Sequence, residues 1–400
     1  MIGPENTPHI ESIINRFDAP FFFYDLDAME RHLSSMIKDL DPSIKLWYAC
    51  KANPMSAILK LMRNLGLGID VASTGELHQV LNTGINPNEV LATGPGKSKE
   101  YLKALLKAGI KTIVLESKNQ AIWLSELIAE MNVNVQTLVR VQLDWADGKS
   151  VLGGNAITPF GLDTAEWEDF NFENYTNLNI KGFHVFQWGN ILDVNRLKEI
   201  WFKTVEEIQA FSKKINIECE VLDLGGGLGI PYNFEDTPLE FSSIKSLLTE
   251  IKQKFRLDQI WMELGRYTVG DHGVYLSKIV DIKTVRGKKI IVCDGGINHI
   301  ARVALVNEAF PATAFNKSSD ETEEYNIHGS LCTALDYLGT FNLPSSLKIG
   351  EWLMFQQAGA YGFTESMPYF LCHMLPGEVI MYKNNLMIPR PPKPSFDWMI

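Results

Sequence analysis

Long hydrophobic runs, a cysteine framework and an excess of positive charge are all missing from this sequence of 400 residues. No segment reaches the roughly 18 apolar residues that a membrane-spanning helix requires, and residues 1–17 lack the basic flank and apolar stretch of a signal peptide. We therefore expect a cytoplasmic protein without a membrane partner. The 37 basic residues are outnumbered by 48 acidic ones, which gives a net charge of −11 and disfavours binding to nucleic-acid phosphates.

Cysteines are few and unpaired in their spacing. The sequence has five, an odd number, and no two of them form a Cys-x-x-Cys pair. This pattern indicates neither a disulfide framework nor a tetrahedral zinc site, so we expect reduced thiols and no metal. The five positions are Cys50, Cys219, Cys293, Cys332 and Cys372.

Apolar side chains, in contrast, are plentiful. Hydrophobic residues make up 46% of the chain and charged residues 21%, which is enough for a large core and is not typical of a disordered protein. The length would accommodate one β/α barrel of about 250 residues with a second module attached.

Short apolar runs alternate with helix-period stretches over the first two thirds of the chain, which is typical of parallel β/α units. Eight such strands can be counted, and they predict a closed (β/α)₈ barrel of the TIM type. The count alone also allows an open doubly wound sheet. The predicted strands are Leu46–Ala49, Ile69–Ala72, Val90–Thr93, Thr112–Leu115, Thr137–Gln142, Gly182–Phe186, Glu220–Leu224 and Gln259–Glu263.

After Arg266 the pattern changes to strands with little helical periodicity. This predicts a C-terminal all-β domain, formed by residues 271–400 together with residues 1–25, beside a barrel over residues 26–270. Asn316–Glu324 reads as a surface loop and Pro389–Pro394 as an extended spacer. The predicted strands of the β domain are Val274–Val285, Lys289–Cys293, Ser346–Phe355 and Glu378–Lys383, and Pro20–Tyr24 could belong to either domain.

In a barrel, chemistry lies at the carboxyl ends of the strands, so polar residues there are candidates for a site. Lys51 follows the first predicted strand and His184 lies on the sixth. Taken alone, the lysine could be a solvated surface residue and the histidine a hydrogen-bonded core residue. At a barrel mouth, however, a partly desolvated lysine has the lowered pKa that favours a Schiff base with an aldehyde.

Two further strand ends carry groups suited to an anion. The seventh strand runs into Gly225–Gly229, where the backbone can donate N–H groups to a phosphate, although Ile230 stands where a dinucleotide site needs its last glycine. The eighth ends in Glu263 and is followed by Arg266, and a plain ion pair is the simplest reading. A lysine, a histidine, a glycine turn, a carboxylate and an arginine on one rim together fit pyridoxal phosphate.

With these motifs in order along nearly the whole chain, the sequence resembles the fold-type III pyridoxal-phosphate decarboxylases, the group of the diaminopimelate, ornithine and arginine enzymes. Six ordered motifs are far more specific than any one of them. They are Lys51 in Tyr-Ala-Cys-Lys-Ala-Asn, His184 in Gly-Phe-His-Val, the triplet Gly225–Gly227, Glu263-Leu264-Gly265-Arg266, Cys332 followed by Asp336, and Gly359-Ala360-Tyr361.

The resemblance implies a role for each matching residue. Lys51 would bind the cofactor covalently, His184 would stack on its ring, and Glu263 would keep the ring nitrogen protonated. An alanine racemase of the same fold has an arginine at that last position, so Glu263 favours decarboxylation over racemisation. The other cofactor-binding positions implied are Gly225, Gly226, Gly227, Gly265, Arg266 and Tyr361, with Asp70, Glu76 and Arg140 as supporting positions.

Cys332 matches the family's cysteine that crosses a homodimer interface and returns a proton to the substrate. A lone cysteine is more often inert core, and the surrounding match is what distinguishes this one. The resemblance therefore implies a homodimer with shared active sites. Thr333 and Asp336 would lie against the substrate, and His299 is a candidate for its far end, with an interface histidine as the alternative.

Departures from the family pattern bear on the substrate. Thr333 stands where the diaminopimelate and ornithine enzymes have an acid that pairs with a distal ammonium. Without that acid a buried distal cation would lose its partner, at a cost of several kcal/mol. Gln187 replaces a usual phosphate-binding serine, Leu264 a usual proline and Pro159 a common lysine.

These departures make the chain resemble the branch that decarboxylates citryl-amino-acid siderophore precursors or carrier-protein-bound amino acids. We expect a decarboxylase acting on an amino-acid moiety whose distal end is neutral or anionic. One alternative is a diaminopimelate- or ornithine-type enzyme with an unusual pocket, and another is a non-catalytic, decarboxylase-like regulator. The regulator is disfavoured because Lys51, Glu263 and Cys332 are all present, and a cofactor-carrier barrel because it lacks a β domain.

Overall fold

The computed structural model describes residues 3–145, 149–150, 153–154 and 156–399. The chain divides into two compact units. A barrel unit comprises Leu33–Gly229 and Pro238–Gly265, and a β unit comprises Met1–His32, Ile230–Thr237 and Arg266–Ile400. Within the described part of the chain, no helix is long and apolar enough to cross a bilayer.

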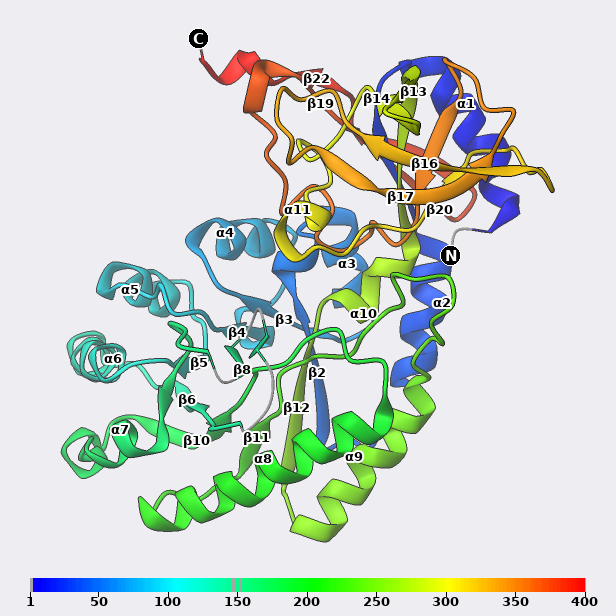
Figure 1. The fold of residues 1–400 in the computed structure, drawn as a ribbon. Helices are drawn as coiled ribbons and strands as arrows, with labels where there is room; N and C mark the ends of the chain where they lie inside the picture. The colour runs from blue at the N-terminus through cyan, green and yellow to red at the C-terminus, as the bar shows by residue number, and fades with distance from the viewer. Residues whose placement is uncertain (1–2, 146–148, 151–152, 155, 400) are drawn as a thin grey trace. The chain divides into compact units, whose positions relative to one another are not determined.

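The barrel unit is a closed ring of eight parallel strands, which confirms the predicted fold class (Figure 1). The ring closes because β10 pairs with β6 on one side and with β11 on the other. The strands are β2 (Ile44–Ala49), β3 (Gly68–Val71), β4 (Val90–Ala92), β5 (Thr112–Leu115), β6 (Gln136–Gln142), β10 (Asn179–His184), β11 (Val221–Asp223) and β12 (Gln259–Leu264). Shorter strands are β7 (Lys149–Ser150), β8 (Gly153–Gly154) and β9 (Leu162–Asp163).

Serine side chains start three consecutive barrel helices. Ser73, Ser98 and Ser117 each accept a hydrogen bond from the backbone N–H three residues further on, which satisfies one of the free donors at a helix N-terminus. The carboxylate of Glu76 accepts from the Ala72 N–H at 2.6 Å, so this predicted pocket residue also closes the first turn of its helix. The helices are α2 (Leu26–Ile37), α3 (Ser56–Asn64), α4 (Thr74–Asn82), α5 (Lys99–Lys107), α6 (Lys118–Met131), α7 (Thr164–Glu168), α8 (Val194–Lys214) and α9 (Phe241–Phe255).

The barrel core joins residues from six strands. Trp47 and Trp261 meet edge to face, with ring centroids 5.2 Å apart. The cluster is completed by Leu91, Val114, Leu138 and Val221. Large side chains fill the space between the strands, as expected for a packed barrel rather than a pore.

One strand begins earlier and ends earlier than predicted. β10 runs from Asn179 to His184, whereas the apolar pattern had placed it at Gly182–Phe186. The register shifts between Ile180 and Gly182, and Gly182 has φ +148°. A Cβ there would lie 1.9 Å from the Val221 carbonyl oxygen, so only glycine allows this bulge.

The β unit is built on a nine-stranded mixed sheet, which agrees with the predicted all-β domain. Its β1 (Phe21–Asp25) pairs antiparallel with β13 and parallel with β20, which assigns the ambiguous N-terminal strand to this unit. The other strands are β13 (Gly273–Val285), β14 (Lys288–Cys293), β15 (Ala312–Ala314), β16 (Thr322–His328), β17 (Tyr337–Pro344), β18 (Trp352–Phe355), β20 (Gly377–Tyr382) and β21 (Asn385–Arg390). Helices α1 (Thr7–Phe17), α10 (Arg266–Val269) and α11 (Arg302–Val306) complete it, with the pair β19 (Met374–Leu375) and β22 (Lys393–Pro394).

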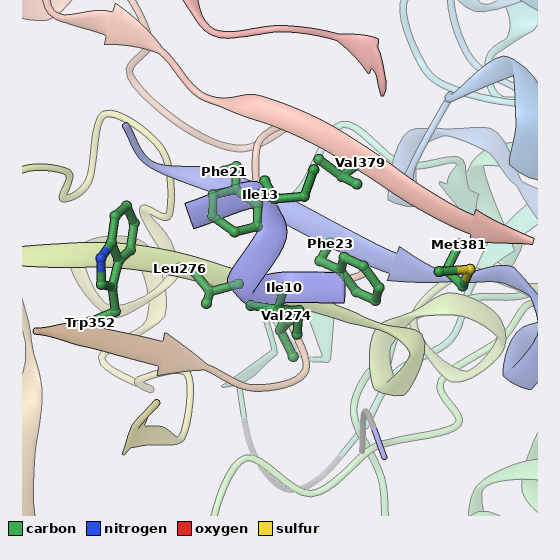
Figure 2. Close-up of a cluster of buried hydrophobic side chains, with 9 residues drawn as sticks. All are labelled: Ile10, Ile13, Phe21, Phe23, Val274, Leu276, Trp352, Val379 and Met381. Atoms are coloured by element: carbon green, nitrogen blue, oxygen red, sulfur yellow. The ribbon is translucent and has the colours of Figure 1, made fainter. Parts of the chain in front are cut away.

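The core of the β unit lies between α1 and the sheet (Figure 2). Ile10 and Ile13 of α1 pack among apolar residues of β1, β13, β18 and β20. These are Phe21, Phe23, Val274, Leu276, Trp352, Val379 and Met381. The alternation along β1 and β13 therefore directs one face of each strand onto the helix.

Three predicted segments of the β unit differ from the structure. The expected surface loop over Asn316–Glu324 becomes strand from Thr322, because these polar residues pair with β17 at the sheet edge. Strand β18 starts at Trp352, since turns occupy the preceding residues of the predicted strand. The proline-rich end is not a free spacer: β22 pairs with β19 in an antiparallel ladder.

Candidate active site

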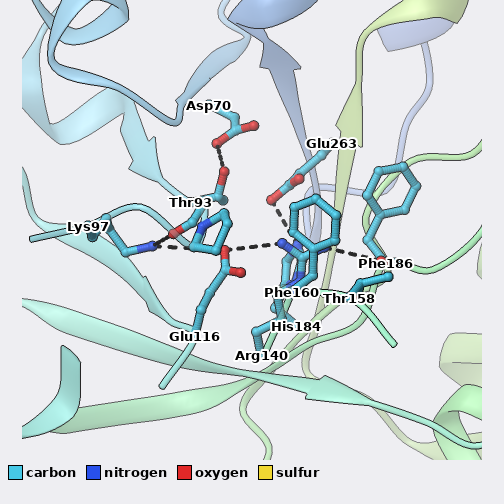
Figure 3. Close-up of polar contacts among 12 residues, drawn as sticks. Asp70, Thr93, Lys97, Glu116, Arg140, Thr158, Phe160, His184, Phe186 and Glu263 are labelled. Carbon is cyan, nitrogen blue, oxygen red and sulfur yellow. Dashed lines mark hydrogen bonds and ion pairs between the residues drawn. The ribbon is translucent and has the colours of Figure 1, made fainter. Parts of the chain in front are cut away.

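Five predicted site residues lie at the carboxyl ends of barrel strands within the barrel unit, and Figure 3 shows four of them, Asp70, Arg140, His184 and Glu263. The five are Lys51 just after β2, Asp70 on β3, Arg140 on β6, His184 at the end of β10 and Glu263 on β12. All except Lys51 are buried. The barrel therefore brings the predicted lysine, histidine and carboxylates to one rim.

Lys51 is held next to a buried carboxylate. Its Nζ lies 3.7 Å from Asp70 Oδ2, and its side chain is 41% exposed. Asp70 Oδ1 accepts a hydrogen bond from the Thr93 hydroxyl at 2.6 Å. Burial and the nearby charge of Glu263 raise the pKa of Asp70 to about 7, although Lys51 opposes this rise. The amine thus remains reachable while its counter-ion is fixed.

His184 and Glu263 form the central pair of the rim. His184 Nε2 lies 3.1 Å from Glu263 Oε1, and both side chains are almost completely buried. Burial alone would raise the pKa of Glu263, but the nearby charge of His184 outweighs burial, so this pKa is lowered. Glu263 therefore stays a carboxylate, as a partner for a cationic ring nitrogen must.

Sequence reasoning missed a third group at this pair. Asp223 ends β11 and is fully buried, and its Oδ1 accepts from the Gly225 N–H at 2.8 Å. Burial and the charge of Glu263 raise the pKa of Asp223 well above its usual value. The signal was available, because a carboxylate at the end of an apolar strand, one residue before three glycines, has no packing reason to be there.

The glycine turn can be built only from glycine. Gly225 and Gly227 have φ +62° and +90°. A Cβ on Gly225 would lie 2.4 Å from Phe186 Cβ, and one on Gly226 would lie 2.1 Å from the Glu263 carbonyl oxygen. Close packing of the turn against both strand ends leaves its backbone as the surface offered to an anion.

A second set of buried charges was also missed. Arg140 Nη1 lies 3.1 Å from Glu116 Oε1, and Lys97 Nζ lies 3.9 Å from the same oxygen. Burial lowers the pKa of Lys97 to about 8. Arg140 also donates to the Phe186 carbonyl at 3.2 Å, next to the glycine turn. The turn that follows β4 therefore ends in a lysine that belongs to a buried ion network.

Gln187, which replaces a usual phosphate-binding serine, has a different task. Its amide accepts from the Leu143 N–H at 2.7 Å and donates to the Leu143 carbonyl at 2.9 Å. This bidentate contact joins the loops after β6 and β10. A small pocket adjoins the glycine turn and includes Trp145 and Trp188 in its lining.

Arg266 and Tyr361, predicted to hold a phosphate, lie together in the β unit. The Arg266 guanidinium stacks 4.8 Å from the centroid of the Tyr361 ring and donates to the Tyr232 hydroxyl. Tyr361 has φ +54°, a conformation that few non-glycine residues adopt. The stacking keeps the guanidinium flat against aromatic faces.

Cys332 and Thr333 lie on a loop of the β unit. Cys332 is exposed and Thr333 is half-buried. The Thr333 hydroxyl accepts from the Leu335 N–H at 3.2 Å, so the side chain also stabilises its own turn.

Asp336 does not lie free for a substrate, contrary to the sequence-based expectation. Its Oδ1 accepts from the Ile297 N–H and its Oδ2 from the Leu331 N–H, both at 2.7 Å. A Cβ on Gly296 or Gly329 would lie within 2.4 Å of this carboxylate. The reason is local: two loops approach through glycines, and the carboxylate satisfies their buried N–H groups.

His299 is likewise a core residue, not a ligand for the far end of a substrate. Its Nδ1 pairs with the Tyr275 hydroxyl and its Nε2 with the Met374 carbonyl, each at 2.8 Å. Burial lowers its pKa to about 4, so the ring is neutral. Neither ring nitrogen is therefore left to bind a substrate, and the described structure does not test the alternative of an interface histidine.

Replacing Asp336 with asparagine is expected to lower the free energy of unfolding by about 1–3 kcal/mol, because one amide NH₂ would then face a buried N–H. Chemical denaturation would measure this loss, and decarboxylation should fall with it, since the same carboxylate orders the Cys332 loop. Asp320→Asn, at an exposed position, is the matched control. Equal stability of the two variants would contradict the structural role.

Several buried atoms of the barrel rim lack a hydrogen-bond partner among the described residues. They are Asp223 Oδ2, Glu263 Oε1 and both ring nitrogens of His184. Such atoms are costly unless something else satisfies them. The ligand atoms of these three residues lie within 4.8 Å of one another, a spacing that would also suit a metal ion. The site is therefore built to receive a polar ligand.

Comparison with known proteins identifies the chemistry of that ligand. The model of the pyridoxal-dependent decarboxylase family, pyridoxal binding domain, matches residues 26–270. An L-glutamyl-[BtrI acyl-carrier protein] decarboxylase of Niallia circulans is 28% identical over 388 residues, 93% of this chain and 90% of the relative. A diaminopimelate decarboxylase of Aquifex aeolicus is 27% identical over 402 residues, which cover 98% of this chain and 93% of the relative.

A third relative acts on a more complex compound. The 2-[(L-alanin-3-ylcarbamoyl)methyl]-2-hydroxybutanedioate decarboxylase of Staphylococcus aureus is 27% identical over 372 residues, 89% of this chain and 92% of the relative. Among solved structures, the diaminopimelate decarboxylase of M. jannaschi aligns with a TM-score of 0.86 at 23% identity, covering 97% of this chain and 93% of that one. At that identity the structural likeness supports the fold alone.

Proposed function

The chain belongs to the pyridoxal-dependent decarboxylases, and on that premise we propose that it removes the α-carboxylate of an amino-acid moiety whose distal end is neutral or anionic. Citryl-amino-acid siderophore precursors and carrier-protein-bound amino acids are the substrate classes that fit. The enzyme is a carboxy-lyase that uses pyridoxal 5′-phosphate.

The barrel rim fits this cofactor. Its orphaned groups are a carboxylate with a lowered pKa, a histidine ring and a glycine turn, which match the ring nitrogen, ring face and phosphate of the cofactor. Lys51 would hold its aldehyde carbon, Glu263 its nitrogen, His184 its ring, and the glycine turn with Arg266 and Tyr361 its phosphate. The bound cofactor withdraws electrons from the α-carbon, so that the bond to the carboxylate can break.

The protein's own residues supply protons and orientation. Glu263 is a buried anion beside His184, and it would keep a proton on the ring nitrogen of the bound cofactor. Cys332 Sγ is the proposed donor of the proton that replaces the lost carboxylate. We further propose a homodimer with shared active sites, in which one copy provides Cys332 to the barrel of the other.

The observation that carries the substrate assignment is the absence of a free carboxylate in the described Cys332 loop, residues 329–336. Asp336 is its one acidic residue, and both carboxylate oxygens accept backbone N–H groups. Thr333 offers only a hydroxyl. A distal ammonium placed here would be desolvated without a counter-ion, which the fold of this loop penalises.

A basic amino acid decarboxylase is the second candidate. The observation in its favour is that diaminopimelate decarboxylases from several organisms match as well in identity, at 27–28%, as the carrier-protein and siderophore-type relatives. Sequence identity at this level does not distinguish a cationic from an anionic substrate. The proposed substrate preference therefore depends on the charge of the Cys332 loop.

Thr333→Glu tests that charge directly. The new carboxylate should raise kcat/KM for diaminopimelate or ornithine by about fivefold, because a partly exposed ion pair contributes about 1 kcal/mol. It should lower kcat/KM for an anionic substrate by like-charge repulsion. Thr333→Gln is the control, because glutamine has the shape of glutamate without its charge. It should leave the ratio of kcat/KM for the cationic and the anionic substrates unchanged. A glutamate variant that behaves like the glutamine variant would refute the proposal.

A further inference from the structure

Asp223 is the one buried titratable residue beside the His184–Glu263 pair to which the mechanism above gives no task. It closes β11 and directly precedes Leu224 and the glycine turn. Its side chain is fully buried, and its two oxygens have different surroundings. A buried acid lowers stability unless hydrogen bonds or charge pairing offset its loss of hydration.

The first oxygen fixes the glycine turn. Asp223 Oδ1 accepts the Gly225 N–H at 2.8 Å, and the Gly225 carbonyl in turn accepts the Glu263 N–H at 2.7 Å. Gly225 is in the left-handed region, which an unrestrained chain would leave readily. The hydrogen bond therefore ties the turn to the end of its own strand and, through Gly225, to β12.

The second oxygen faces the central pair. Asp223 Oδ2 has no hydrogen-bond partner among the described residues, and it is part of the group whose ligand atoms lie within 4.8 Å of one another. Two carboxyl groups this close in a dry site do not both ionise. The charged groups that face Asp223 are Glu263 from β12, His184 from β10, Asp70 from β3 and Arg140 from β6.

Those neighbours decide which acid keeps the proton. Glu263 has His184 at 3.1 Å, which favours its charged form. Arg140 is the cation whose charge acts on Asp223, but it already pairs with Glu116 at 3.1 Å. Asp223 has no cation of its own, and burial together with Glu263 raises its pKa. The proton therefore stays on Asp223 and the charge on Glu263.

We propose that Asp223 is a positioning residue that acts as a neutral acid: one oxygen holds the phosphate-binding turn, and the protonated oxygen leaves Glu263 as the single anion available to the ring nitrogen. The inference rests on the proposed placement of the cofactor and concerns no substrate. It links the phosphate end and the nitrogen end of the site through one side chain.

The neutral form can be tested by comparing Asp223→Asn with Asp223→Ala. Asparagine keeps the acceptor for the Gly225 N–H and is neutral at every pH, so its Kd for pyridoxal phosphate should stay within about threefold of the wild-type value. Alanine leaves that buried N–H unsatisfied and should weaken binding by about tenfold or more. If both variants weaken binding equally, Asp223 acts as a charged group and the proposal is wrong.

Stability of the cofactor-free, full-length protein gives an independent readout. A carboxyl whose pKa is raised on folding takes up a proton, so its contribution to stability is present at low pH and is lost as pH rises. Between about pH 4 and the folded-state pKa of Asp223, each rise of one pH unit shifts the wild-type folding equilibrium about tenfold towards the unfolded state. Asp223→Asn, which cannot titrate, does not show this shift.

The asparagine variant should therefore become increasingly more stable than the wild type as the pH rises from 4 towards the folded-state pKa of Asp223. Asp258→Asn, the same change at an exposed site before β12, should track the wild type. An Asp223→Asn protein that tracks the wild type at every pH would overturn the proposal. Neither readout involves turnover, so failure here is distinct from failure of the proposed decarboxylation.

Discussion

Replacing Lys51 with alanine is expected to lower kcat for decarboxylation by at least about 10³-fold. The amine of Lys51 is reachable, at 41% side-chain exposure, and it lies 3.7 Å from a buried counter-ion, Asp70. Alanine removes the group that would hold the cofactor covalently. Borohydride reduction followed by peptide mapping should attach the cofactor to the Lys51 peptide in the wild type and to no peptide in the variant.

A matched control separates this effect from a general loss of positive charge. Lys60→Ala changes an exposed lysine on α3 and should leave both turnover and labelling unchanged. Lys97 provides an internal comparison, because it is buried and its amine donates to the Gly94 carbonyl. Turnover by Lys51→Ala, or labelling of Lys97 in place of Lys51, would show that the reactive amine has been misassigned.

Glu263→Gln should lower kcat by about 10²–10³-fold while the protein still binds the cofactor. The neutral amide is nearly the same size, so packing against His184 is kept, but it cannot hold a proton at the ring nitrogen. Loss of such a preorganised charge in a buried site has effects of this size. Stopped-flow or steady-state CO₂ release gives kcat, and equilibrium dialysis gives cofactor affinity.

The same variant has a second signature in its pH dependence. Glu263 is one of the groups that raise the pKa of Asp70 to about 7, so removing its charge should lower that pKa. Any kinetic or spectroscopic transition near neutral pH that reports Asp70 should then move to lower pH. Glu207→Gln, at an exposed position on α8, should move neither kcat nor the transition. An unchanged kcat in Glu263→Gln would contradict the role assigned to this carboxylate.

The barrel could be predicted from the sequence because its signals are local. Each strand is a short apolar run, and residues such as Ser73 mark the helix starts by capping them. Once the strand ends are located, Lys51, His184 and Glu263 are brought to one rim by topology alone, since parallel strands in a closed ring share a carboxyl end. The Gly182 bulge escaped prediction because its cause, close approach to Val221, lies on the neighbouring strand.

The rest of the site could not be predicted because it depends on pairings between distant positions. Glu116 and Arg140 are 24 residues apart, and nothing in either segment indicates that they meet. Asp336 looked like a substrate contact because it follows the cysteine motif, but buried N–H groups from another loop determine its role. In the same way, the segment around His299 does not indicate that Tyr275 and Met374 occupy both of its ring nitrogens.

The most direct test of the proposed function is the substrate preference of the wild-type enzyme, measured as kcat/KM for CO₂ release. Four substrates are compared. Diaminopimelate and ornithine carry a distal cation, whereas a citryl-amino-acid conjugate and a carrier-protein-bound glutamyl group do not. Because the Cys332 loop offers no free carboxylate, one of the latter two should exceed both cationic substrates by at least about 100-fold. Equal or greater activity on diaminopimelate or ornithine would contradict the account.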